Sequence, residues 1–249
     1  MDKEKAQVIG AAITSGLSAA ANFGFNLSPE TLSLLNSCTP LLQLSFERVL
    51  ELFCKKDLVN VELARFSIST SEALKTIKSN EQHGMVLNKV FLSERYSKTD
   101  EILEATMRAA INDAQNIKSL FYGRLIGNVL FQNKYDESSI FALLRVAAQL
   151  SYDELCLLYI IDREPGHQYE QLIKKAERDI NAQEFAQYLL HFKGLGLVTR
   201  IPPFFLGATL DSLKISALGH DLVSLLGLDS LDHDDCDAMR NLLLSSIRV

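Results

Sequence analysis

Apolar side chains recur every three or four residues along most of this chain. The clearest case lies between Thr99 and Val129, where one face carries Leu103, Met107, Ile111, Ala114, Ile117, Phe121 and Leu125. This spacing is typical of an amphipathic helix, and Thr99-Asp100-Glu101 supplies a cap and negative charge for its start. We predict one helix of about 30 residues here, which at ~1.5 Å per residue is about 45 Å long.

The stretch between residues 6 and 46 carries a single charge, Glu30. Ser28 as N-cap, Pro29 at the first helical position and Glu30 in the first turn predict that a helix starts here. Pro40 then predicts a kink or break before a further helix over residues 41–54, because proline cannot donate a backbone hydrogen bond.

Residues 7–22 form an uncharged segment that is long enough to span a bilayer. Small residues follow one another at a spacing of four, Gly16, Ala20 and Gly24, which permits close approach of another helix. Polar side chains and many alanines give the segment little transfer free energy. We therefore expect a helix buried against the protein or a partner subunit, and membrane contact through residues 1–46 is the alternative.

The last third of the chain opens with a strong helix start. Ser151-Tyr152-Asp153-Glu154 is a capping box, in which the serine and the glutamate satisfy two backbone N–H groups. The apolar spacing predicts three successive helices, over residues 153–162, 169–178 and 182–193.

A short hairpin is expected after these helices. Glycines end the third helix, residues 197–200 alternate as a strand, and residues 213–216 form the returning strand. Ser216 then caps a helix over residues 217–226, in which Gly219 permits close backbone packing.

This order of elements resembles the winged-helix superfamily. The resemblance rests on Gly196-Leu197 before the first wing strand and on Ser216-Ala217-Leu218-Gly219 after the second, and it implies a fold rather than a ligand. We therefore expect a mainly α protein with an N-terminal helical bundle and a C-terminal winged-helix module of three helices plus a β-hairpin. We expect three domains. Residues 1–148 form a helical domain that is nearly uncharged over residues 1–46. Residues 149–228 form a winged-helix-like domain, and residues 229–249 form an acidic linker and a final helix.

DNA-binding winged helices place their third helix in the major groove and touch phosphates with the wing. The resemblance thus implies these candidate nucleic-acid-binding residues: Asn181, Gln183, Gln187, His191, Lys193 and Arg200. Glu184 on the same helix would oppose phosphate. Residues 151–228 hold ten acids and seven bases, a net charge of −3, which favours contact with a protein surface.

The predicted wing is apolar where a DNA-binding wing would carry lysine or arginine. Phe204, Phe205 and Leu206 stand at its tip and are candidate partner-binding residues. Large exposed apolar patches are rare on monomers, so we expect this tip to pack on the N-terminal helices or to meet a partner or a second copy.

Composition narrows the class of protein further. A hydrophobic fraction of 47% with 22% charged residues is ordinary for a globular protein, and the net charge of −6 argues against a surface devoted to nucleic acid. The four cysteines are far apart and form no CxxC pair, which is typical of reduced thiols. The N-terminus lacks a basic region before its apolar stretch, so we expect no signal peptide and a cytoplasmic protein.

No sequence motif with a catalytic mechanism occurs, whether a phosphate-binding loop, a dinucleotide fingerprint, a zinc-protease helix or a nucleophile elbow. The five histidines are scattered, and residues 232–236, Asp-His-Asp-Asp-Cys, lack the usual ligand spacing. We therefore expect no catalytic residue, no metal and no cofactor.

The uncharged N-terminal segment, the long helices and the phrase Leu150–Glu154 also resemble bacterial abortive-infection proteins of the alpha type, which implies a role in phage defence or stress. We expect a non-enzymatic helical interaction or regulatory protein that binds a protein partner or forms a homo-oligomer. The alternatives are a DNA-binding transcriptional regulator and a peripheral membrane-associated effector.

Overall fold

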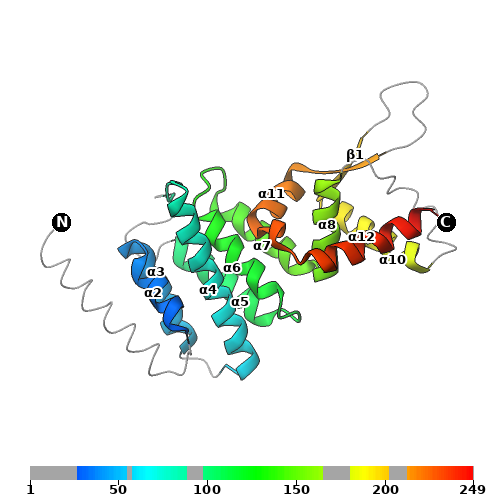
Figure 1. The fold of residues 1–249 in the computed structure, drawn as a ribbon. Coiled ribbons are helices and arrows are strands. Elements are labelled where there is room, and N and C mark those ends of the chain that lie inside the picture. Colours follow the sequence, from blue (N-terminus) through cyan, green and yellow to red (C-terminus); the bar gives the residue numbers. More distant parts are fainter. Residues whose placement is uncertain (1–26, 55–57, 89–97, 165–179, 202–211, 249) are drawn as a thin grey trace, which may run out of the picture. The chain divides into compact units, whose positions relative to one another are not determined.

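The computed structural model describes residues 27–54, 58–88, 98–164, 180–201 and 212–248. Over these ranges the protein is mainly helical, with one two-stranded antiparallel sheet (Figure 1). The chain divides into two compact units, residues 1–148 and 149–249. Within the described ranges, none of the helices combines the length and the hydrophobicity needed to cross a bilayer.

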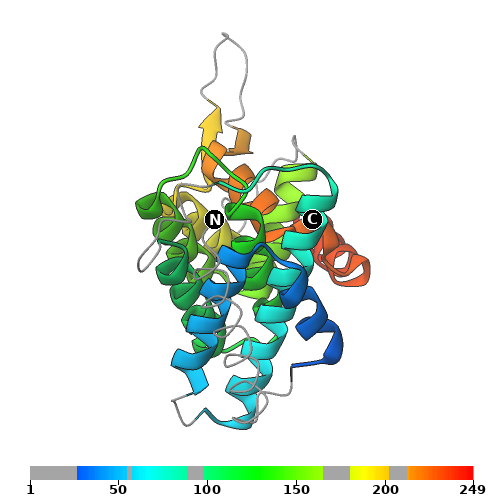
Figure 2. The same cartoon turned by 90° about the vertical axis from the view of Figure 1, so that its left-hand side faces the viewer.

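The first unit begins with the helices expected around Pro29 and Pro40. Helix α2 spans Pro29–Ser37, and Thr31 N donates to Ser28 Oγ at 3.1 Å, which confirms Ser28 as the N-cap. Helix α3 spans Pro40–Cys54, so the chain breaks before Pro40 and the proline opens the new helix. In both views these blue helices lie beside the cyan helix α4, which α2 contacts (Figures 1 and 2). Residues 1–26, which include the small-residue segment, lie outside the described ranges.

Four further helices complete this unit: α4 (Asn60–Gln82), α5 (Lys98–Asn112), α6 (Lys118–Val129) and α7 (Glu137–Gln149). Helices α4 and α6 pack backbone against backbone at two glycines one turn apart on α6. A Cβ atom at Gly123 would overlap the Ser69 carbonyl oxygen, and one at Gly127 would lie 2.5 Å from Thr76 Cβ. Only glycine fits at these two positions, so they set the distance between the helices.

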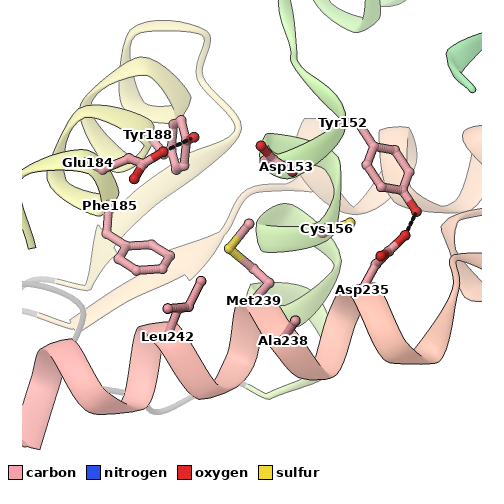
Figure 3. Close-up of a pocket in the computed structure, with 10 residues that line it drawn as sticks. All are labelled: Tyr152, Asp153, Cys156, Glu184, Phe185, Tyr188, Asp235, Ala238, Met239 and Leu242. Atoms are coloured by element: carbon pink, nitrogen blue, oxygen red, sulfur yellow. Dashed lines mark hydrogen bonds between the residues drawn. The ribbon is translucent and has the colours of Figure 1, made fainter. Parts of the chain in front are cut away.

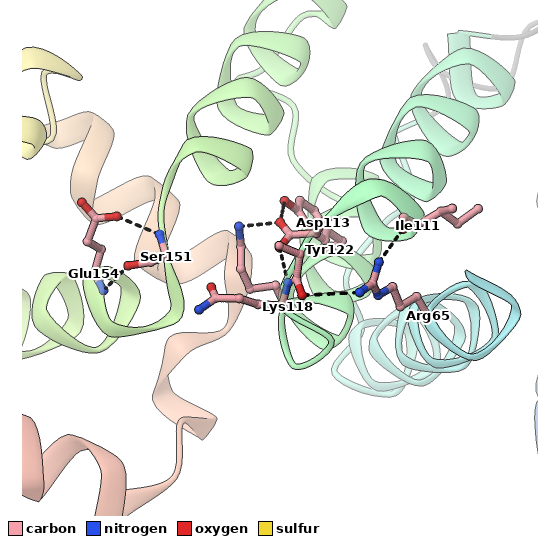
Figure 4. Close-up of polar contacts among 9 residues, drawn as sticks. Arg65, Ile111, Asp113, Lys118, Tyr122, Ser151 and Glu154 are labelled. Atoms are coloured by element: carbon pink, nitrogen blue, oxygen red, sulfur yellow. Dashed lines mark hydrogen bonds and ion pairs between the residues drawn. The ribbon is translucent and has the colours of Figure 1, made fainter. Parts of the chain in front are cut away.

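The single long helix expected from Thr99 to Val129 is two helices, α5 and α6, separated by residues 113–117. Arg65 on α4 stabilises this break through two hydrogen bonds. Its Nη1 donates to the Ile111 carbonyl at 2.9 Å, and its Nε donates to Asn116 Oδ1 at 2.7 Å (Figure 4). The first bond satisfies a backbone carbonyl at the end of α5 that would otherwise pair with a continuing helix, and the second holds the side chain of Asn116 in the break. Ala114 and Ile117, which continue the apolar spacing through the break, are exposed there and do not join the core.

A buried polar cluster fixes the start of α6. The Lys118 ammonium lies 2.5 Å from Asp113 Oδ2, and the Tyr122 hydroxyl donates to the same oxygen at 2.7 Å (Figure 4). Only 4% of the Lys118 side chain and 7% of the Asp113 side chain are exposed. Burial alone would raise the pKa of Asp113, but hydrogen bonds from Lys118, Tyr122 and the Gln115 N–H, together with the lysine charge, hold it below its usual value of 3.8.

This lowered pKa makes the first unit acid-sensitive. A carboxyl group with a lower pKa in the folded state stabilises the fold above its unfolded pKa, and this contribution is lost as the pH falls through the folded pKa. We expect the free energy of unfolding of the wild type to fall steeply below about pH 4. In Asp113→Asn the slope over this range should be shallower, as measured by urea unfolding at several pH values. An unchanged slope would contradict this account of Asp113.

Within its described residues, the second unit contains the expected strand pair and the expected helices before and after it. Its elements are α8 (Tyr152–Arg163), α10 (Ile180–Gly194), β1 (Val198–Ile201), β2 (Ser212–Ile215), α11 (Ala217–Leu226), the 3₁₀ helix η2 (Leu228–Ser230) and α12 (His233–Arg248). The strands are antiparallel, with Val198 opposite Ile215. The helix predicted over residues 169–178 lies outside the described ranges.

The caps predicted at Ser151 and Ser216 are confirmed. Glu154 N donates to Ser151 Oγ at 3.2 Å and Ser151 N donates to Glu154 Oε2 at 2.7 Å, which completes the capping box of α8 (Figure 4). Gly219 N donates to Ser216 Oγ at 3.0 Å. A Cβ atom at Gly219 would overlap the Leu197 carbonyl oxygen, so this glycine permits the close packing of α11 on the hairpin.

The C-terminal segment differs from the acidic linker and final helix that we expected over residues 229–249. Helix α12 already begins at His233, with Asp234 and Asp235 in its first turn, where the positive end of the helix dipole stabilises negative charge. The helix contacts α8 and α10 and buries Cys236 and Leu243. The C-terminal segment is therefore a structural element of the second unit.

Candidate functional site

Helices α8, α10 and α12 enclose a groove of about 350 Å³ on the second unit (Figure 3). The lining residues are Tyr152, Asp153 and Cys156 from α8, Glu184, Phe185 and Tyr188 from α10, and Asp235, Ala238, Met239 and Leu242 from α12. On each helix these residues are three, four or seven positions apart, or adjacent, so they share one face. The groove is thus built from three helix faces that meet only in the folded unit.

The floor of the groove is apolar. Met239 and Leu242 project from α12 toward Phe185 on α10 (Figure 3). Phe185 packs edge to face with Tyr188, with ring centroids 6.3 Å apart. Leu242 remains 52% exposed although it belongs to this apolar surface. A large exposed leucine within a concave apolar surface marks a place where another molecule could bury it.

Three carboxylates surround this floor: Asp153, Glu184 and Asp235. The Tyr188 hydroxyl donates to Glu184 Oε1 at 2.7 Å, and the Tyr152 hydroxyl donates to Asp235 Oδ2 at 2.8 Å. Burial and these hydrogen bonds raise the pKa of both tyrosines, so both hydroxyls are protonated donors at neutral pH. No lysine, arginine or histidine occurs among the described residues that line the groove, so its rim is negatively charged.

Cys156 at the base of the groove is unsuited to nucleophilic chemistry. Burial, followed by the proximity of Cys236, raises its pKa to about 12. The thiolate is the reactive form of cysteine, and it is scarce at neutral pH when the pKa is this high. With an unreactive thiol, an apolar floor and three carboxylates around it, the groove suits reversible binding of a molecule that has a cationic part and an apolar part.

The candidate nucleic-acid-binding residues do not form one free surface. Gln183, Gln187 and Lys193 are exposed on α10. His191 instead places Nδ1 2.6 Å from Oε1 of the buried Glu154 on α8, so this histidine joins two helices. The other two candidates, Asn181 and Arg200, lie in α10 and β1, and their side chains are outside the described part of the structure.

The apolar wing tip that we considered for partner binding, Phe204, Phe205 and Leu206, also lies outside the described ranges. Sequence reasoning missed the groove. Its signals in the sequence were the apolar faces of single helices, such as the face of the last helix to which Met239 and Leu242 belong, and such a face gives no indication of which helices it meets.

Among the described residues, no group of three or more His, Cys, Asp or Glu side chains is placed to hold a metal ion. Comparison with protein-family models, with curated proteins and with solved structures finds no match to this chain. Its function must be inferred from the geometry and charge of the groove.

Proposed function

We propose that this chain is a non-enzymatic helical interaction or regulatory protein whose second unit binds a segment of a partner protein in the groove between α8, α10 and α12. The observation that supports this most is the exposed Leu242 on an apolar floor with three carboxylates around it. An apolar centre with a polar rim is the usual composition of a protein-binding surface.

The order of elements supports a winged-helix module in this role. Helix α8, helix α10, strands β1 and β2 and helix α11 lie in the order that the resemblance implies, and the further helix that it implies between α8 and α10 falls outside the described ranges. Helix α10 takes the place of the helix that reads DNA in such modules, but here it contributes three side chains to the groove and contacts α12. We propose that this module is used for protein contacts.

The charges near α10 weigh against the DNA-binding alternative. Gln183, Gln187 and Lys193 could approach a duplex, but Glu184 is exposed on the same helix and Asp153 lies across the groove from it. Carboxylates at this position would repel phosphates. A DNA-binding protein would show salt-sensitive duplex binding that weakens when Lys193 is replaced.

The biological process is proposed on the resemblance to abortive-infection proteins alone, namely phage defence or a stress response in bacteria.

A second copy of this chain is the simplest alternative partner. Light scattering on the full chain distinguishes a second copy from a different partner protein, because self-association through the groove would be lost in a groove variant.

The proposed function is tested by selecting random displayed peptides on the immobilised full-length chain. We expect the selected peptides to bind the wild type and to lose at least about tenfold in affinity for Leu242→Asp, because the charge would enter the apolar floor. Leu190→Asp is the matched control. Leu190 is also an exposed leucine of this unit, with an exposed fraction of 54% against 52% for Leu242, but it does not line the groove. Peptides that bind both variants equally well, or no recovered peptide, would contradict the proposed function.

A further inference from the structure

The groove has a marked charge asymmetry. Its described lining contains three acids and no base, and two of the acids are held in place by tyrosine hydroxyls. Each of these carboxylates has a second oxygen that can accept further hydrogen bonds. The groove is therefore complementary to a positively charged group with several N–H donors.

The geometry at one end of the groove is more specific. Figure 3 shows Asp153 on α8 across the groove from the Glu184–Tyr188 pair on α10. Two carboxylates that face each other in a concave site repel one another, and a cation between them removes that repulsion. The Tyr188 ring beside Glu184 provides an aromatic face on which a flat cation can stack.

Resting on the proposed function, we propose that the groove recognises an arginine side chain of the partner segment together with a neighbouring apolar side chain. The guanidinium lies between Asp153 and Glu184 and against Tyr188. The apolar neighbour covers Met239 and Leu242. Arginine fits better than lysine because its planar fork can bind a carboxylate through two parallel hydrogen bonds and stacks on aromatic rings.

The size of the groove supports side chains of a segment as the occupant. Its volume of about 350 Å³ holds a few side chains and is too small for a folded surface. The exposed Leu242 requires an apolar contact that a free small cation would not supply. Charge and apolar surface together therefore specify a peptide segment with both features.

The test uses the peptides that depend on the groove, meaning those that bind the wild type and not Leu242→Asp. We expect them to share an arginine beside an apolar residue. Replacing that arginine with citrulline, its uncharged isostere, should weaken binding to the full-length chain by about tenfold in fluorescence anisotropy. Glu184→Gln, which keeps the acceptor for Tyr188, should weaken the arginine peptide similarly and leave the citrulline peptide nearly unchanged.

The matched control is Asp234→Asn, which removes one exposed acid of the same unit outside the groove lining and should leave the arginine peptide within about twofold. If groove-dependent peptides lack arginine, or if citrulline binds as tightly, arginine recognition is wrong while the protein-binding function stands. If no peptide depends on Leu242, the proposed function itself fails. The two failures are thus distinguishable within one set of peptides.

Discussion

Gly123→Ala is expected to lower the free energy of unfolding of the first unit by about 2–3 kcal/mol. A glycine to alanine change inside a helix normally gains roughly 0.5–1 kcal/mol, because alanine loses less conformational entropy on folding. Here the new Cβ would overlap the Ser69 carbonyl oxygen and lie 3.0 Å from Ala73 N. Both neighbours are backbone atoms of α4, so α4 and α6 would have to separate. Urea unfolding followed by circular dichroism measures the loss.

Gly194→Ala is the control for this substitution. Gly194 is the last residue of α10, and a Cβ atom there meets nothing within 4 Å. We expect this variant to be as stable as the wild type or slightly more so. A Gly123→Ala protein that gained stability would show that the two helices are not in backbone contact.

Lys118→Met should destabilise the first unit by about 3–5 kcal/mol, because it leaves the buried Asp113 carboxylate without its cation. The Asp113–Lys118 pair lies almost entirely out of solvent. Adding Asp113→Asn should recover part of the loss, since the amide oxygen can still accept from Tyr122 while the unpaired charge is gone. Equilibrium unfolding of the single and double variants gives the coupling between the two residues.

Lys98→Met provides the comparison with an exposed pair. Lys98 lies 3.6 Å from Glu137, and 53% of its side chain is exposed. Surface pairs of this kind contribute about 0–1 kcal/mol because solvent screens them. If Lys118→Met cost no more than Lys98→Met, the Asp113–Lys118 cluster would not be the buried pair that the structure describes.

Local signals in the sequence predicted much of the fold. The caps at Ser28, Ser151 and Ser216 depend on residues three positions apart, and all three form as expected. The strand pair after α10 followed from glycines and alternation. These features are readable because their causes lie within one turn of chain.

The features of the fold that the sequence did not predict have long-range causes. The break between α5 and α6 depends on Arg65, which is 46 residues before the carbonyl that it binds at Ile111. The close contact at Gly123 was likewise hidden, because a glycine in a helical stretch does not indicate which helix approaches it. Neither the Arg65 hydrogen bond nor the close contact at Gly123 changes the 3.6-residue spacing of apolar residues that predicts a helix.

The groove was missed for the same reason. Its rim and floor come from three helices whose lining residues span positions 152 to 242, and each helix alone shows an ordinary amphipathic pattern. The candidate residues implied by the resemblance lie on α10, except Arg200 in β1. On α10 the groove uses the neighbouring positions Glu184, Phe185 and Tyr188 instead of Gln183 and Gln187. Only tertiary packing shows which face of α10 meets α8 and α12.

The paired glycines on α6 also have a mechanical consequence. Because α4 and α6 touch through main-chain atoms over one full turn, neither helix can slide or roll against the other without forcing Thr76 into the backbone of its neighbour. We therefore expect the two helices to behave as one rigid body, so that any internal motion of the first unit carries both of them together.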